Sequence, residues 1–181
     1  MPGNNQFMSY NEIENKLAVY DISSQLLKNF GTEPPIVVCV GSDKVLSDMV
    51  GVFVAEKLKK CNANIVVFGG FNRCFNKSDA KYLSNKIDVS RLLFVDSGLL
   101  ETDGVIAVSP VFRLNNGLTI NSTSIIAGTI KKQGKKICLA KTKFAEIEKY
   151  AQIIADSICD YLCYVQMLNR SENHYKKMPI I

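Results

Sequence analysis

The fold is decided by the stretch Ile36-Val37-Val38-Cys39-Val40-Gly41-Ser42-Asp43-Lys44-Val45-Leu46-Ser47-Asp48-Met49-Val50-Gly51. It begins with an unbroken apolar run rich in β-branched side chains, which is typical of a strand covered on both faces. Glycine and two aspartates follow, and a helical pattern then continues to about Lys60. We expect Ser47 to cap this helix and Asp48 to lie in its first turn, where the helix dipole favours an ionised carboxylate.

A second apolar run also ends in an acid, in Arg91-Leu92-Leu93-Phe94-Val95-Asp96-Ser97-Gly98. The carboxyl ends of strands in an open α/β sheet are where ligands and catalytic groups gather. Two such strands would bring Asp48 and Asp96 to one rim, and paired carboxylates can activate water. Asp43 and Asp48 also have structural explanations, as a turn residue and a first-turn helix acid. Asp96 is harder to explain structurally, because an unpaired charge close to the core is expensive.

The remaining pattern predicts a single α/β domain. Ser9 is the expected N-cap of a helix that Gly31 ends, and the rigid pair Pro34-Pro35 follows. Further strands are predicted at 64–68, 105–108 and 136–140, a short extended segment at 118–122, and a strand or short helix at 124–130. Helices are predicted from about Ser78 to 87 and from about 143 to 167. This order predicts a three-layer α/β/α sandwich with a mostly parallel sheet, divided into an N-terminal helix and connector (1–35), the domain (36–168) and a polar tail (169–181).

Composition narrows the possible partners. The chain has 181 residues, 47% of them hydrophobic and 22% charged, which is the balance of one globular domain. Its net charge is +5, but the basic residues are scattered, so we expect no nucleic-acid partner. No apolar run approaches the roughly 20 residues that span a bilayer, and the first residues lack the features of a signal peptide. We therefore expect a cytoplasmic protein without a membrane partner.

Cysteine and histidine usage argues against several kinds of site. The six cysteines contain no Cys-x-x-Cys pair, as expected for buried thiols in a reducing compartment. Cys159 and Cys163 share a helix face and could bind a metal, but zinc usually needs four ligands, so core packing is the preferred interpretation. His174 is the only histidine, which disfavours a Ser-His or Cys-His hydrolase. Neither nucleotide-binding glycine motif is present, and we expect no cofactor and no bound metal.

The two acidic segments carry a resemblance to a known family. The pattern Val40-Gly41-Ser42-Asp43-Lys44-x-x-Ser47-Asp48-x-x-Gly51 resembles the C-I-G-T-D-R-x-x-G-D-x-L-G-P signature of the YyaC-type spore proteases. Phe94-Val95-Asp96-Ser97-Gly98-Leu99 and the following 104–108 resemble that family's second block, V-D-A-x-L-G with a V-G-x-I-x-V strand. The weaker stretch 114–121 falls where the family has a P-G-x-G-x-x-K loop. The resemblance covers about 36–165.

That family is similar to the germination protease of spores and to the hydrogenase maturation endopeptidases. The resemblance implies a phosphorylase/hydrolase-like fold, with Asp48 and Asp96 as the catalytic pair and Asp43 as a third acid. It also implies a protein or peptide substrate, with small spore proteins as candidates, in the cytoplasm of a forespore or spore. An ionised Asp48 would take a proton from water while a protonated Asp96 polarises the scissile carbonyl, or the two roles are exchanged.

Several family positions are replaced. Ser47 stands for a glycine and Val52 for a proline, the loop lysine is absent, and no P-V-H-A element follows the second strand. The histidine with which the maturation endopeptidases bind nickel has no internal counterpart here. Two other interpretations therefore stay open. One is a catalytically degenerate binding or assembly protein whose long C-terminal helix docks a partner or a second copy. The other is a metal-dependent hydrolase with Asp43, Asp48 and Asp96 as oxygen ligands.

Overall fold

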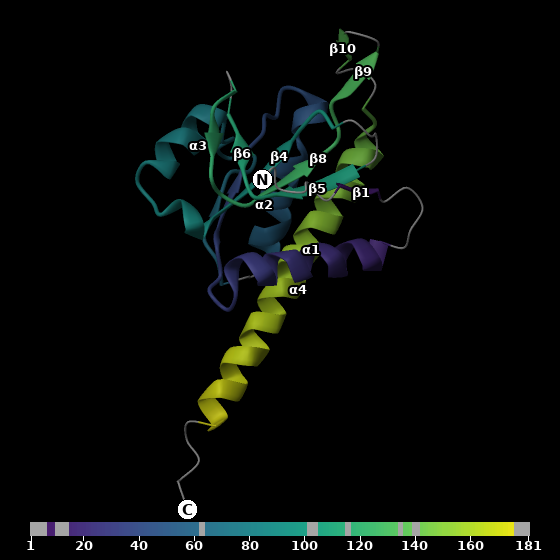
Figure 1. The fold of residues 1–181 in the computed structure, drawn as a ribbon. Coiled ribbons are helices and arrows are strands. Elements are labelled where there is room, and N and C mark those ends of the chain that lie inside the picture. The colour runs from purple at the N-terminus through teal and green to yellow at the C-terminus, as the bar shows by residue number, and fades with distance from the viewer. Residues whose placement is uncertain are drawn as a thin grey trace, which may run out of the picture.

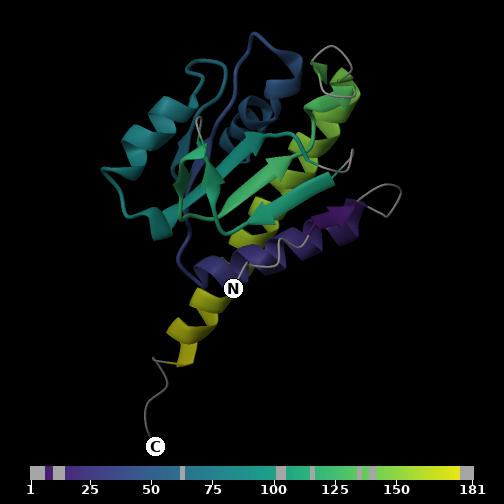
Figure 2. The ribbon, with the colours of Figure 1, turned by 45° about the horizontal axis from the view of Figure 1, so that its top comes forward.

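A mostly parallel, six-stranded sheet forms the middle layer of the protein, in the order β1–β5–β8–β4–β2–β3 (Figures 1 and 2). The structure, a computed structural model, describes residues 7–9, 15–61, 64–100, 105–114, 117–133, 136–138 and 142–175. Strands β3, β2, β4 and β8 are parallel, whereas β5 runs antiparallel to both β8 and β1. The strand bounds are β1 Phe7–Ser9, β2 Ile36–Cys39, β3 Val67–Phe68, β4 Leu92–Ser97, β5 Val105–Ser109 and β8 Ser124–Ala127.

Helices cover both faces of this sheet, which confirms the predicted three-layer fold. One face packs against helices α1 (Asn15–Phe30), α2 (Val50–Lys60) and α4 (Phe144–Tyr175). The other packs against α3 (Lys77–Ser84) and the ribbon of β6 (Phe112–Arg113) and β7 (Thr119–Ile120). Two single turns, η1 (Leu46–Asp48) and η2 (Val89–Arg91), and the ribbon of β9 (Lys131–Gln133) and β10 (Lys136–Cys138) complete the fold. Helix α4 crosses α1 and extends past the body of the domain (Figure 1). None of the described helices combines the length and apolar character needed to span a membrane.

Strand β4 is buried along its whole length and feeds two separate cores. Leu93 and Val95 join the cluster on the side of α1, α2 and α4, whereas Leu92 and Phe94 join the cluster on the α3 side. Phe94 stacks on Phe112 with ring centroids 4.3 Å apart. Because side chains alternate along a strand, the residue after Val95 faces α3 and the next one faces α2 and α4.

The predicted start of the first helix is wrong. Ser9 is not a helix cap but the last residue of β1, where it pairs with Val105 of β5. This long-range pairing supplies backbone hydrogen bonds that the sequence alone could not indicate. Helix α1 is described from Asn15 and ends at the predicted Gly31 (φ 57°), and its Leu17 and Tyr20 side chains are exposed.

The C-terminal half of the chain also departs from the prediction in places. The segment that could have been strand or helix is strand β8, and β3 is shorter than expected. Strand β10 pairs with β9 outside the main sheet. Helix α4 continues to Tyr175, into the segment predicted as a polar tail, because the sequence has no helix breaker before Pro179. Cys39 is buried as predicted, but Cys163 is exposed, so the expected core packing is wrong for that thiol.

Candidate active site

The loop after β2 folds back on itself at the carboxyl edge of the sheet. The backbone N–H of Ser42 donates to the carbonyl oxygen of Asp48 at 3.1 Å, which closes the loop. A Cβ atom at Gly41 would collide with this same carbonyl oxygen, so the closed loop requires glycine there. This close contact explains why glycine follows the strand. The hydrogen bond from Ser42 fixes the backbone of Asp48 at the end of the loop.

Asp48 lies in η1, directly before α2, and is half-buried. The prediction that Ser47 caps α2 is wrong, because α2 begins only at Val50 and has no side-chain cap. The carbonyl oxygen of Ser47 instead accepts from the hydroxyl of Thr129 at 2.7 Å, and that of Asp48 accepts from Ser42. Both carbonyls therefore serve tertiary contacts. Burial raises the pKa of Asp48, and the charge of Lys77 partly opposes that rise.

Asp96 enters the interior from β4 on the face that α3 covers. Only 2% of the residue is exposed. Its Oδ1 accepts from the backbone N–H of Ser97 at 2.8 Å, and its Oδ2 lies 3.3 Å from Nζ of Lys77. Burial raises the pKa of Asp96 to about 6; the nearby Lys77 ammonium lowers it, and the negative charge of Asp48 raises it further. The structure thus brings the two predicted acids into electrostatic contact.

Lys77 is the charged neighbour of both acids that the sequence did not indicate. It is the first residue of α3, whose start is fixed by a capping box between Asn76 and Asp79. Phe75 forms a parallel bridge to Val40, so the beginning of α3 lies beside the end of β2. A lysine at the positive end of a helix is unfavourable by itself, and here the two carboxylates offset that cost. The capping box could have indicated where the helix begins, but not which acids its first residue meets.

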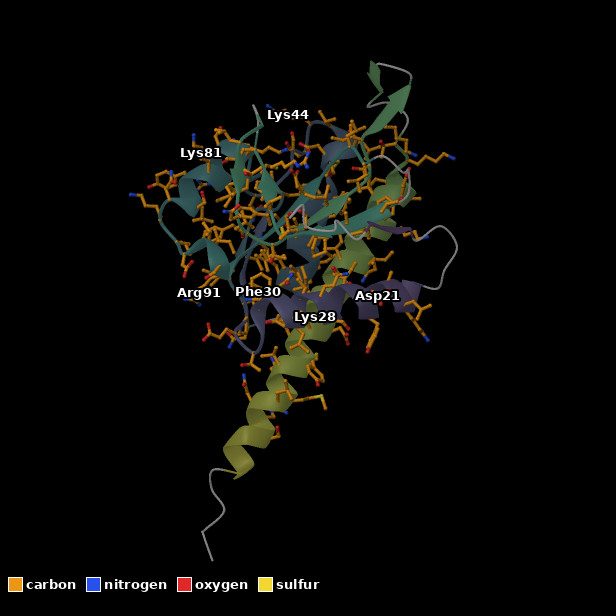
Figure 3. The ribbon with its side chains drawn as sticks, in the orientation of Figure 1. Asp21, Lys28, Phe30, Lys44, Lys81 and Arg91 are labelled. Carbon is orange, nitrogen blue, oxygen red and sulfur yellow. The ribbon has the colours of Figure 1, made fainter. Side chains whose placement is uncertain are left out.

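Asp43 does not join this group of charges. It is exposed in the loop, and within the described residues no ion pair or hydrogen bond links it to Asp48 or Asp96. Figure 3 places its neighbour Lys44 at the edge of the domain away from Arg91, the residue that precedes β4, and thus at the edge where β4 ends, but on the solvent side of the loop. In the described part of the chain, no three acidic, cysteine or histidine side chains are arranged to hold a metal ion. The three acids therefore do not form the oxygen-ligand cluster considered from the sequence.

The stretch 114–121, which falls where the family has its P-G-x-G-x-x-K loop, contains strand β7. Gly117 has a φ of 78° and Asn121 is exposed, beyond the short strand β7. Residues 115–116 of this stretch, and residue 104 of the second family block, lie outside the described residues.

Two buried hydroxyl groups flank the carboxylates. Ser47 directly precedes Asp48 and is fully buried, and Ser97 directly follows Asp96 and is 4% exposed. Within the described residues, neither Oγ atom has a hydrogen-bond partner. A buried unpaired hydroxyl costs about 1–3 kcal/mol, and such groups are rare in folded proteins. The rim that carries the acids therefore also carries polar groups that do not stabilise the fold.

These features define the class of protein: a three-layer α/β protein with a buried aspartate, a half-buried aspartate and one lysine at the carboxyl edge of its sheet. Such a group can bind and move a proton near neutral pH. Residues 8–157 match the family model described as "Protein of unknown function (DUF1256)", and the chain belongs to this family. Comparisons with curated proteins and with solved structures gave no match.

Proposed function

We propose that this protein is a peptide-bond hydrolase of spore-forming cells, related to the YyaC-type spore proteases, in which Asp48 and Asp96 activate water. The observation that supports it most is that these two acids, from segments far apart in sequence, interact electrostatically with each other and with Lys77. The resemblance supplies the substrate class, small spore proteins, and the location in the cytoplasm of the forespore or spore. The family membership is compatible with this proposal but adds no activity of its own.

The environments of the two acids suggest how they divide the work. Asp96 is the more deeply buried, so it holds its proton up to a higher pH, whereas Asp48 is nearer to solvent. Asp48 is therefore the better candidate for the base that takes a proton from water. The attacked carbonyl oxygen also needs a hydrogen-bond donor, a role that the sequence-based expectation gives to a protonated Asp96.

Substitution of each acid by asparagine tests this proposal. Purified Asp48→Asn and Asp96→Asn variants, incubated with small spore proteins, should cleave ~100-fold more slowly or worse, because each loses a group that handles protons. Asp21→Asn on α1, which Figure 3 shows at the edge of the domain away from Lys44, is the matched control and should retain the wild-type rate. Asp43→Asn tests the third acid and should also retain it. Mass spectrometry of the fragments gives the rates; wild-type cleavage by both site variants would refute the proposal.

A binding or assembly protein on the same fold is the second candidate. The ion pair between Asp96 and Lys77 favours it, since such a pair can be purely structural. A cavity of about 280 Å³ between α1 and α4 favours it too, because Tyr20, Tyr164 and Met167 on its rim are exposed. This candidate predicts no cleavage of any small spore protein and a concentration-dependent mass in analytical ultracentrifugation.

A further inference from the structure

Lys77 and Asp48 form the outer layer of the site, and Asp96 lies behind them. The Lys77 side chain is 30% exposed, whereas that of its partner Asp96 is 3% exposed. Asp48 is half-buried. A polypeptide that arrives from solvent therefore meets the ammonium group and the Asp48 carboxylate before it can reach Asp96.

The surroundings of Lys77 hold its ammonium group in place but do not use all of its N–H donors. One side of Nζ faces Oδ2 of Asp96 at 3.3 Å, and the ring centroid of Phe112 lies 5.8 Å away. An ammonium group has three N–H donors, and within the described residues Asp96 is the acceptor that faces it. The backbone below it is fixed by the bridge between Val40 and Phe75 and by the capping box of α3. Such a donor is preorganised, because little of it must move to meet a substrate.

We propose that Lys77 is the catalytic residue that faces the substrate carbonyl, and that Asp96 is its buried counter-ion. This inference rests on the proposed function and gives Lys77 the role expected of a protonated Asp96. Asp48 takes a proton from water, and the water oxygen bonds to the carbonyl carbon. The carbonyl π electrons move onto oxygen, which accepts a hydrogen bond from the Lys77 ammonium. When the tetrahedral intermediate collapses, the C–N bond breaks and Asp48 returns its proton to the amine nitrogen.

The two arrangements predict opposite pH profiles. If a protonated Asp96 polarised the carbonyl, kcat would fall as the pH rises above about 6, where Asp96 loses its proton. If Lys77 does so, ionised Asp96 is the better counter-ion and kcat persists through neutral pH. The charged groups around Asp96 are Lys77 of α3 and Asp48 of η1, and Ser97 of β4 donates its backbone N–H.

Kinetics of Lys77 variants test the role directly. Lys77→Met should lower kcat for small spore proteins by ~100-fold or more, because it removes the donor to the developing oxyanion. Its KM should change little, since the contact strengthens only in the transition state. Lys77→Arg should recover part of kcat, and Lys81→Met, one turn further along α3 and labelled in Figure 3, is the control and should match wild type. Wild-type kcat in Lys77→Met, or loss of kcat above pH 6 in the wild-type protein, would overturn the proposal.

Chemical labelling tests the layered arrangement without any activity. Limited treatment with a carbodiimide and an amine should modify Asp48 and leave Asp96 unmodified, and limited acetylation should modify Lys77. Equal modification of both aspartates, or no modification of Lys77, would overturn the arrangement. If the wild-type protein cleaves no small spore protein, the proposed function fails, and the labelling pattern still supports or refutes the outer position of Lys77.

Discussion

Replacing Asp96 with asparagine should make the protein more stable at neutral pH while removing its proposed activity. Burial raises the pKa of this carboxyl group from an ordinary value of 3.8 to about 6. The folded state therefore binds the proton more tightly than the unfolded state, and stability falls as the pH rises from about 4 to about 6. Above that range the loss is complete. A pKa difference of about two units corresponds to about 3 kcal/mol, at 1.36 kcal/mol per unit.

Asparagine has nearly the same shape as aspartate but does not titrate. The variant should therefore be more stable than the wild-type protein only at pH values where the Asp96 carboxyl is ionised. The measurement is urea denaturation of wild-type and Asp96→Asn protein at a series of pH values. The difference between their unfolding free energies should shift by about 3 kcal/mol in favour of the variant from about pH 4 to pH 7. Taking this difference cancels the titration of groups that both proteins share.

The control is Asp21→Asn, which removes one carboxylate from α1 and leaves the site intact. A free-energy difference that stays flat with pH, or that turns against Asp96→Asn at neutral pH, would refute the reasoning. It would mean that the Lys77 ammonium compensates the buried charge in full. If Asp96→Asn instead makes the protein more stable and removes its activity, the wild-type carboxyl costs stability that the function requires. Such a trade-off is expected at a functional site.

Three further substitutions test the frame that holds the site, each by chemical denaturation. Gly51→Ala should destabilise the fold by about 2–4 kcal/mol, because a Cβ atom there would collide with the carbonyl oxygen of Val40; wild-type stability would show that α2 can move away. Thr129→Val should cost about 1–3 kcal/mol, because it leaves the buried carbonyl of Ser47 without its hydroxyl donor, and an unchanged midpoint would contradict this contact. Ser47→Ala should stabilise by up to about 1 kcal/mol, since it removes an unpaired buried hydroxyl, whereas a loss would reveal a partner for that group.

The parts of the fold that could be predicted are those whose burial is visible in the local pattern of residues. Strands β2 and β4 are covered on both faces, so each begins with a run of four apolar residues that is visible in the sequence. Within their bounds, the strands at the edges of the sheet have no such apolar run. Strand β1 at one edge and β3 at the other are short, and the pairing of β1 with β5 depends on a segment about a hundred residues away. The three-layer fold was therefore predictable, but the boundaries at its edges were not.

The residues of the candidate site also differ in whether the sequence could predict them. Asp96 could be proposed from sequence because an acid that closes an apolar strand has few structural explanations. Lys77 could not, because its place depends on the bridge between Val40 and Phe75, which joins two loops only after the sheet has formed. The predicted role of Ser47 as a cap followed a local rule, which a tertiary contact of the loop overrode, whereas the role of Asp43 as a third acid came from the family resemblance.

Several residues at the carboxyl edge of the sheet are unfavourable for stability, and this is evidence that the edge has a function. Lys77 stands at the positive end of a helix, Asp96 is buried with a raised pKa, and the hydroxyl groups of Ser47 and Ser97 are buried without partners in the described structure. Each of these features costs stability, and a neutral residue of similar size would remove the cost. A chain shaped only for folding has no reason to collect all of them at one edge of its sheet. Violations that converge in this way are typical of functional sites, where the chemistry of the site and not the stability of the fold determines the residues.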